Sequence, residues 1–163
     1  MRRNVALIAG VAIAAVTITP HAPRLIWNAS ASVPEGLYRV AQHGGLSRGA
    51  LVLARPEPRI AQFAAMRGYL PRNVPLLKHA AGLPSDRVCN DGGKVFINGR
   101  KVATALSHDA RKRPLPQWRG CITLAADAVF LLNPGVPSSF DGRYFGPLST
   151  SSILGIAVPL WTP

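Results

Sequence analysis

The chain has 163 residues and a mass of 17.3 kDa, which allows one ordinary domain, alone or with a small appendage. Apolar residues make up 48% and charged residues 16%, a composition that excludes a disordered polar chain. The net charge of +12 favours an anionic partner, but the basic residues are scattered and only Arg111, Lys112 and Arg113 form a run. We therefore expect a solvated face beside the anionic lipids of a membrane and no nucleic-acid partner.

The N-terminal segment indicates on which side of a membrane the rest of the chain lies. Arg2 and Arg3 precede an uncharged apolar run at residues 5–19. Such a run spans about 22 Å as a helix, so by length it is a signal-peptide core or a marginal membrane anchor. We expect an uncleaved transmembrane anchor over residues 1–22, with a cleaved segment as the alternative. The arginines would hold the N-terminus in the cytoplasm and place residues 23–163 outside as one exported domain.

The rest of the chain predicts mainly β structure. Gly and Pro number 15 each, which argues against a helical bundle, and short apolar runs alternate with turn signals. Asn98-Gly99 between alternating apolar residues is the strongest two-residue hairpin signal. We expect coiled antiparallel sheets with one or two short helices. The expected elements are a linker at 20–27, strands at 37–40, 50–54, 74–81, 94–102, 126–132 and 153–158, a turn at 44–45, a helix at 60–68 and a loop at 103–120.

Two cysteines, Cys89 and Cys121, bear on the redox state. The sequence contains no CxxC pair and no histidines at metal-ligand spacing, so we expect no metal site. In an oxidising compartment the pair would form one disulfide. Two buried free thiols are the alternative.

The first segment that could contribute to a catalytic site is residues 28–38, which read NASASVPEGLY. Ser30 and Ser32 lie two apart just before a proline, and Gly36 permits a tight turn into a strand. Ser32 would sit on a bend that presents its hydroxyl and its N–H to a cleft. An ordinary turn serine is the alternative.

The second segment is residues 74–88, in which Lys78 lies inside an otherwise apolar strand. Burial disfavours the ammonium form, and a neutral lysine can accept the proton of a serine hydroxyl, as in Ser-Lys nucleophile activation. The alternative is a lysine on an edge strand whose amine extends to water.

The third segment is residues 138–148, which read SSFDGRYFGPL. Asp141 and Arg143 are placed to pair within a compact turn. By itself this pattern is typical of a structural salt bridge.

Together and in this order, the three segments resemble the type I signal peptidase superfamily, and in particular the TraF-type conjugal-transfer peptidases that mature pilin precursors. The first resembles the N-x-S/T-x-S-x-P-x-G-x-Y box, the second the K-x-x-x-G-x-P-G-D box, and the third the D-x-R-Y-F-G-P box. RGYLP at 67–71 and the Asn98-Gly99 hairpin are also similar to that branch. The resemblance covers residues 28–158.

The resemblance implies a role for each matched residue. Ser32 would be the nucleophile and Lys78 the general base. The N–H of Ser32 and the hydroxyl of Ser30 would stabilise the oxyanion, and Asp141 and Arg143 would support the site. No metal or cofactor is implied.

The sequence departs from the family pattern at three positions. Ser85 stands where glycine is usual, and Ala50 stands where a Gly-Asp pair is common. Gly142 stands where serine is frequent, which removes a hydroxyl that would bond Lys78, and Ser139 is one candidate to replace it.

The implied activity is serine endopeptidase cleavage of an exported, pilin-like precursor after a small residue, on the periplasmic side of a bacterial inner membrane. The sequence leaves open whether the acyl-enzyme is hydrolysed or cyclised. A catalytically vestigial, membrane-anchored component of a conjugation or secretion apparatus is the alternative.

Overall fold

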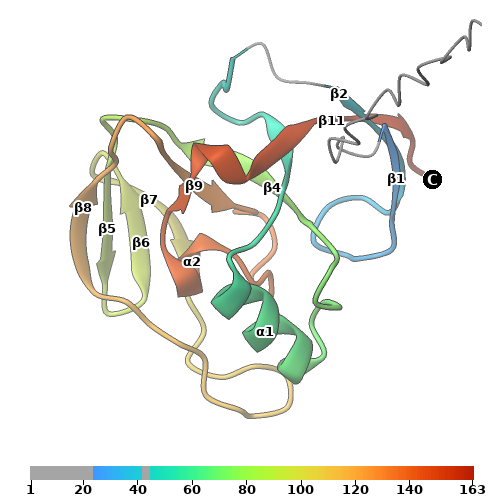
Figure 1. The fold of residues 1–163 in the computed structure, drawn as a ribbon. Coiled ribbons are helices and arrows are strands. Elements are labelled where there is room, and N and C mark those ends of the chain that lie inside the picture. The colour runs from blue at the N-terminus through green and yellow to red at the C-terminus, as the bar shows by residue number, and fades with distance from the viewer. Residues whose placement is uncertain (1–23, 42–44) are drawn as a thin grey trace, which may run out of the picture.

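The computed structural model describes residues 24–41 and 45–163, which form two antiparallel sheets and a few short helices (Figure 1). The larger sheet has seven strands in the order β1-β2-β11-β3-β4-β9-β10, and the smaller has four in the order β7-β6-β5-β8. The strands are β1 (Leu25–Asn28), β2 (Gly36–Ala41), β3 (Leu51–Ala54), β4 (Leu76–Gly82), β5 (Arg87–Asp91), β6 (Lys94–Ile97), β7 (Arg100–Thr104), β8 (Gly120–Thr123), β9 (Ala128–Leu132), β10 (Leu148–Ser149) and β11 (Ile153–Trp161). The mainly β prediction is confirmed.

Strand β9 links the two sheets through the alternation of its side chains. Val129 and Leu131 pack with Val52 on one face, whereas Phe130 and Leu132 pack with the small sheet on the other. A strand that is buried on both faces reads as a continuous apolar run, and residues 128–132 have the sequence AVFLL. Apolar packing on both faces of β9 therefore fixes the position of its C-terminal end, where the chain continues from Leu132.

The predicted hairpin lies in the small sheet. Strands β6 and β7 pair, with Ile97 opposite Arg100, and the two turn residues Asn98 and Gly99 have φ values of 51° and 79°. Positive φ at both central residues is the geometry that favours an Asn-Gly turn. This prediction is confirmed.

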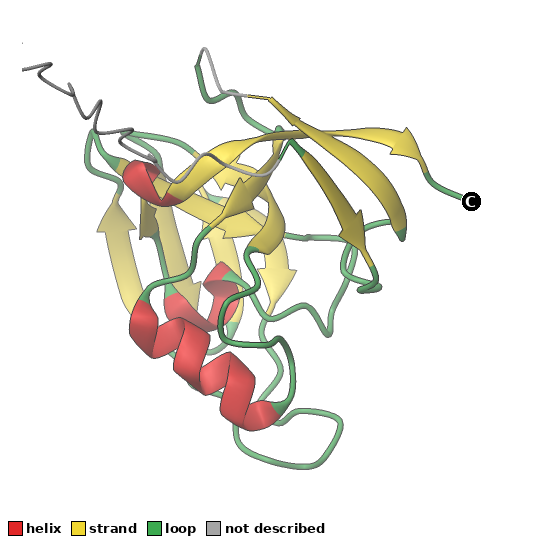
Figure 2. Cartoon of the chain, turned by 45° about the vertical axis from the view of Figure 1, so that its right-hand side comes forward, coloured by secondary structure: helices red, strands yellow, loops and turns green. Residues whose placement is uncertain are grey.

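The two helices lie next to each other on one side of the strands (Figure 2). Helix α1 (Pro58–Arg67) begins with proline in its first turn and ends at Gly68 in the left-handed conformation. Helix α2 (Gly142–Phe145) is a single turn that begins after Asp141. Aromatic side chains pack between them, since Phe140 stacks on Phe63 of α1. The chain also forms a 3₁₀ turn at Thr150–Ser152.

Four strands were not expected from the sequence, namely β1, β5, β8 and the two-residue β10. Residues 20–27 were predicted as a linker, but Leu25–Asn28 form β1, which pairs with β2 as an outer strand of the sheet. Strands β5 and β8 were also missed, and β8 is exposed along its length and carries no apolar alternation. Their pairing depends on contacts between segments far apart in the chain, so local patterns do not reveal them.

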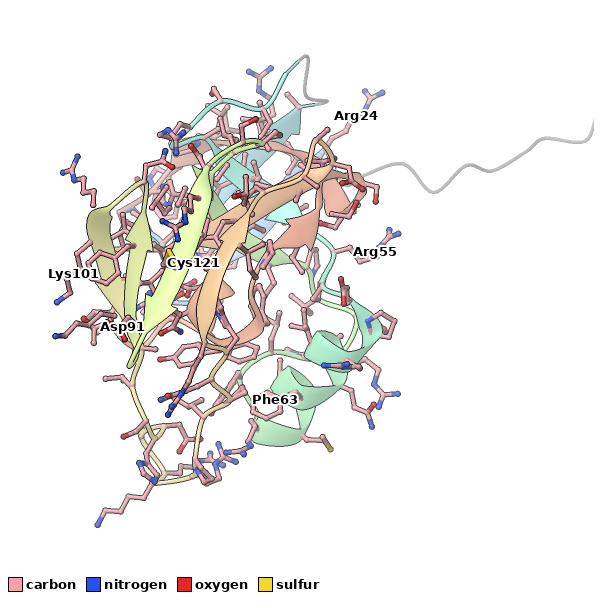
Figure 3. All side chains as sticks on the ribbon, turned by 90° about the vertical axis from the view of Figure 1, so that its left-hand side faces the viewer. Arg24, Arg55, Phe63, Asp91, Lys101 and Cys121 are labelled. Atoms are coloured by element: carbon pink, nitrogen blue, oxygen red, sulfur yellow. A yellow bond between two sulfur atoms is a disulfide. The ribbon has the colours of Figure 1, made fainter. Side chains whose placement is uncertain are left out.

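The predicted anchor at residues 1–22 lies outside the described residues, as does the first of the two residues of the turn predicted at 44–45. Within residues 24–41 and 45–163, no helix is long and apolar enough to cross a membrane. Basic side chains such as Arg24, Arg55 and Lys101 project away from the body of the domain in different directions (Figure 3).

A disulfide joins β5 to β8. Cys89 and Cys121 lie directly opposite each other in the antiparallel pair and are 32 residues apart in the chain. A cross-link over a loop of this length stabilises a fold mainly by restricting the unfolded chain. It also fixes the outer strand β8, which buries little apolar surface itself.

We predict that replacing Cys89 and Cys121 together by serine lowers the free energy of unfolding by about 3–4 kcal/mol. Guanidinium denaturation measures this change. Reductant should lower the unfolding midpoint of the unaltered protein and leave that of the double variant unchanged. Equal midpoints for the two proteins under oxidising conditions would contradict the prediction.

Candidate active site

The loop between β1 and β2 carries both candidate serines, and the Asn28 side chain maintains its shape. Asn28 Nδ2 donates to the carbonyl oxygen of Ser30 at 2.8 Å. The same nitrogen lies 3.1 Å from the Val33 oxygen and 3.0 Å from the Pro34 oxygen. Asn28 Oδ1 accepts the Ser30 N–H at 3.1 Å. One nearly buried amide thus ties both ends of the loop that presents Ser32.

The hydroxyls of Ser30 and Ser32 lie 3.2 Å apart. Ser30 Oγ donates its proton to Asn28 Oδ1 at 2.8 Å. Because a hydroxyl has one hydrogen, Ser32 is then the donor in the contact between the two serines. The Ser30 hydroxyl is therefore placed beside the oxygen that would attack a substrate.

Lys78 is a buried lysine in the interior of the larger sheet. Strand β4 runs between β3 and β9, and Lys78 lies opposite Val52 of β3. Its side chain is 4% exposed, and Nζ donates to Ser139 Oγ at 3.0 Å. The alternative of a lysine on an edge strand with its amine in water is therefore wrong.

Burial controls the protonation of Lys78. Desolvation lowers the pKa of the amine from 10.5 to about 8. The Asp141 carboxylate acts in the opposite direction, and the Arg143 guanidinium lowers the pKa further. A neutral amine, which is the form that can accept a proton, is therefore accessible near pH 8.

Asp141 and Arg143 form the buried ion pair that their spacing predicts. Arg143 NH2 lies 2.8 Å from Asp141 Oδ2, Arg143 Nε lies 2.9 Å from Asp141 Oδ1, and the two side chains are 1% and 0% exposed. Among the described residues neither side chain makes a salt bridge to Lys78. Asp141 therefore acts on Lys78 through its electric field and not by direct contact.

The Arg143 guanidinium also fixes the loop that leads to Ser139. It donates to the carbonyl oxygens of Asn133 and Val136 at 2.8 Å, and to that of Pro137 at 3.2 Å. Charged donors on main-chain carbonyls make strong hydrogen bonds. Arg143 thus supports Ser139 and, through it, the orientation of the Lys78 amine.

The structure explains one of the three departures from the family pattern, at Gly142, and shows at Ser85 why glycine is usual there. A Cβ at Gly142 would lie 2.7 Å from the Leu131 carbonyl oxygen and 2.8 Å from the Phe130 ring, so serine does not fit there. The hydroxyl that contacts Lys78 comes from Ser139 instead, as the sequence suggested. Ser85 has a φ of 72°, in the left-handed region that favours the glycine usual at this position.

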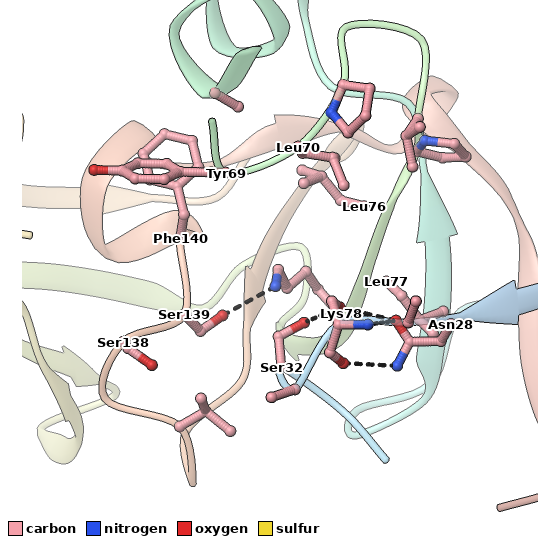
Figure 4. A pocket seen from close by; sticks show the side chains of 18 of the residues that line it. Asn28, Ser32, Tyr69, Leu70, Leu76, Leu77, Lys78, Ser138, Ser139 and Phe140 are labelled. Carbon is pink, nitrogen blue, oxygen red and sulfur yellow. Dashed lines mark hydrogen bonds between the residues drawn. The ribbon is translucent and has the colours of Figure 1, made fainter. Parts of the chain in front are cut away.

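One cavity of about 820 Å³ brings the three segments together (Figure 4). Ser30, Ser32, Lys78 and Ser139 all line it, together with many apolar side chains. In Figure 4 the Lys78 amine points to the Ser139 hydroxyl, and Ser32 lies on the same side of the cavity. Asp141 and Arg143 are not part of the lining and support it from behind.

A family model described as signal peptidase, peptidase S26, matches residues 2–161. The chain belongs to this signal peptidase family. A conjugal transfer protein TraF from Agrobacterium fabrum is 31% identical over 155 residues, which cover 90% of this chain and 81% of that protein. A plasmid transfer protein TraF from Escherichia coli is 30% identical over 167 residues, which cover 96% and 93%. The predicted relationship to TraF-type signal peptidases is confirmed.

Among solved structures, a signal peptidase I from Enterococcus faecalis is similar to this family member with a TM-score of 0.42 and 21% identity. The similarity covers 71% of this chain and 98% of that chain.

Two site residues of this signal peptidase family member received no role from the sequence. Asn28 is the first residue of the nucleophile box, and it organises the serine loop. Asn133 donates to the Ser32 carbonyl oxygen at 2.7 Å, although 101 residues separate the two. Its only sequence signal is its position after a buried strand and before Pro134, which is also typical of a turn asparagine.

We predict that Lys78→Met stabilises the fold at neutral pH. The pKa of Lys78 is lower in the folded state than in the unfolded chain, so the unfolded chain binds more protons between about pH 8 and 10.5, and stability rises with pH in that window. The advantage of the methionine variant should fall from about 3 kcal/mol at pH 7 to below about 1 kcal/mol at pH 10.

Urea denaturation at the two pH values measures this difference. Lys101→Met replaces an exposed lysine and serves as the control, with no comparable pH trend expected. An advantage of Lys78→Met that stays constant with pH would contradict the assignment of a depressed pKa to Lys78.

Proposed function

We propose that this protein is a membrane-anchored serine endopeptidase in which Ser32 is the nucleophile and Lys78 the general base. The observation that carries the proposal is the Lys78 amine: it is 4% exposed, its pKa is lowered to about 8, and it lines the same cavity as Ser32. A buried lysine near neutrality that lines the same cavity as a serine hydroxyl is consistent with Ser-Lys catalysis, although the hydroxyl in contact with Lys78 is that of Ser139.

In the proposed reaction, neutral Lys78 accepts the proton of Ser32 Oγ as this oxygen attacks the scissile carbonyl carbon. The tetrahedral intermediate collapses, Lys78 gives the proton to the leaving amine, and an acyl-serine ester remains. Water, or an amine of the substrate, then attacks the ester with Lys78 again as base, and Ser32 is released. Hydrolysis and cyclisation differ only in this last nucleophile.

In this proposal two donors stabilise the oxyanion, namely the N–H of Ser32 and the hydroxyl of Ser30. The Ser30 hydroxyl now donates to Asn28 Oδ1, 2.8 Å away, and a rotation of its hydrogen would direct it to the substrate oxygen. Each donor of this kind contributes about 3 kcal/mol to transition-state stabilisation in other enzymes. The remaining bond of Asn28 to the Ser30 N–H keeps the loop in place.

Ser139 supports the base in this proposal. A neutral amine that donates one hydrogen to Ser139 Oγ at 3.0 Å has its lone pair directed elsewhere. With Ser32 on the same side of the cavity, the lone pair is then available for the Ser32 proton.

The proposed substrate is an exported, pilin-like precursor that is cut after a small residue. This proposal is supported by the relatives named conjugal and plasmid transfer proteins. The apolar run in residues 1–22 would anchor the enzyme in the bacterial inner membrane with residues 23–163 in the periplasm. Basic side chains near the surface would hold the domain against anionic lipids.

We predict that Ser32→Ala and Lys78→Ala each lower precursor cleavage by at least about 10³-fold while the domain stays folded. The assay incubates the full-length protein in phospholipid vesicles with a pilin-like precursor and follows the products by mass spectrometry. Products that gain the mass of one water indicate hydrolysis, and a product without this gain indicates cyclisation.

Ser47→Ala and Lys101→Ala are the matched controls, since both residues are exposed and neither lines the cavity. Normal cleavage by either site variant would overturn the Ser-Lys mechanism. No cleavage of any exported precursor by the unaltered protein would favour the vestigial component.

We predict that kcat/KM rises with pH and levels off above about pH 8, where Lys78 becomes neutral. An internally quenched peptide with alanine on the acyl side of the scissile bond serves as substrate. A rate that is flat from about pH 6 to pH 10 would remove Lys78 from the role of base.

A further inference from the structure

We propose that Asn133 is a positioning residue that sets the separation between Ser32 and Lys78, an inference that rests on the proposed function. Asn133 is the first residue after β9, is 2% exposed, and does not line the cavity. Its side chain contacts the two segments that carry the nucleophile and the base.

Asn133 continues the pairing of β9 with β4 through its side chain. His79 lies opposite Leu132, so the antiparallel register places Asn133 opposite Lys78. Asn133 Nδ2 donates to the Leu77 carbonyl oxygen at 3.3 Å, and Oδ1 accepts the His79 N–H, also at 3.3 Å. A side-chain amide thus bonds the peptide groups on both sides of Lys78, including the Leu77 carbonyl oxygen that the N–H of residue 134 would bond in a continuing strand.

The chain cannot continue the strand itself at this point. The next residue is Pro134, which has no N–H to donate to β4. The main-chain N–H of Asn133 faces away from β4 in this register and donates to Asp141 Oδ2 at 3.1 Å. The side-chain amide therefore takes the place of the missing main-chain bond to the Leu77 carbonyl oxygen, at the point where the chain turns away toward Ser139.

The same amide group holds the nucleophile loop. Asn133 Nδ2 donates to the Ser32 carbonyl oxygen at 2.7 Å, so its two hydrogens serve the oxygens of Ser32 and Leu77. The nucleophile and the residue before the base are therefore fixed to one planar NH₂ group. A shift of this group would move Ser32 relative to Lys78.

The position of Asn133 is itself determined by the buried ion pair. Its carbonyl oxygen accepts from Arg143 NH2 at 2.8 Å, and its N–H is bound by Asp141. Each main-chain and side-chain polar group of Asn133 therefore has a partner inside the site. Asp141 and Arg143 thus reach Ser32 through Asn133, without contact to a substrate.

The orientation of the amide has a consequence for His79. Because the Nδ2 hydrogens face two carbonyl oxygens, the group that faces His79 Nδ1 at 2.9 Å is the acceptor Oδ1. His79 Nδ1 must then carry a hydrogen. This is the fourth hydrogen bond of the Asn133 side-chain amide, and together the four bonds prevent the amide from rotating.

Asn133→Asp is the test variant, because aspartate has the same size and keeps the acceptor for His79 but cannot donate to Ser32 or Leu77. We predict that kcat on the quenched peptide falls about 10- to 100-fold, since a misplacement of the reacting groups by about 1 Å has effects of this size. KM should stay within about threefold, because Asn133 does not line the cavity.

The added carboxylate should also raise the pKa of Lys78 and shift the rise of kcat/KM to higher pH. The charged groups that face Lys78 in the unaltered site are Asp141 and Arg143, with His79 beside it in the chain. Asn133→Ala, which adds no charge, should lower kcat without this shift.

Asn90→Asp is the matched control. Asn90 is also 2% exposed, its Oδ1 accepts the Gly93 N–H at 2.9 Å, and its Nδ2 has no partner among the described residues. It lies in β5, away from the cavity, and the substitution should leave kcat, KM and the pH profile unchanged.

The outcomes separate this inference from the proposed function. If Ser32→Ala is inactive but folded Asn133→Asp and Asn133→Ala retain kcat within twofold, the positioning role is wrong and the peptidase stands. Normal activity of Ser32→Ala would contradict the proposed peptidase mechanism, and with it the positioning role of Asn133.

A measurement on the unaltered protein covers the case in which neither variant folds. The two side-chain amide protons of Asn133 should give separate NMR resonances that are protected from solvent exchange. Rapid exchange of both protons would overturn the positioning role.

Discussion

Burying an ammonium group without a carboxylate in contact disfavours its charged form, and this constraint acts on Lys78. The amine is 4% exposed, and its hydrogen-bond partner Ser139 is uncharged. The ion pair behind it contributes one charge of each sign, with Asp141 raising the pKa of Lys78 and Arg143 lowering it. Because these two effects oppose each other, desolvation decides the outcome. The pair can therefore brace the surrounding loops without converting Lys78 into a permanent cation.

The strands serve this arrangement by fixing main-chain positions around one amine. Strand β4 is an interior strand, so both of its edges are occupied near Lys78, by β3 on one side and by the Asn133 amide on the other. The serine loop departs from β1 and returns as β2, and Asn28 joins its two ends. The side chains of Asn28 and Asn133 thus hydrogen-bond main-chain groups at two points where strand pairing does not hold the segments together.

Local features were predictable from the sequence, whereas long-range ones were not. The Asn98-Gly99 hairpin and the end of α1 at Gly68 follow from backbone preferences within a few residues. The motif around Lys78 indicated a buried amine, and the structure places it in the sheet interior. Strand β1 was missed because Pro20 and Pro23 precede it and favoured a linker, although its pairing with β2 makes it a strand. The contacts of Asn133 join segments that no local pattern connects.

The bond between Asn133 and the Ser32 carbonyl closes a loop of 101 residues. Contacts between such distant segments carry a loop-closure entropy that must be offset before they form, so they favour late steps in folding. Under the proposed export and peptidase activity, a chain that is still being translocated has its serine loop outside long before residues 133–143 follow. We expect the newly exported N-terminal half to be proteolytically silent, with activity beginning only when the final segment has crossed and folded.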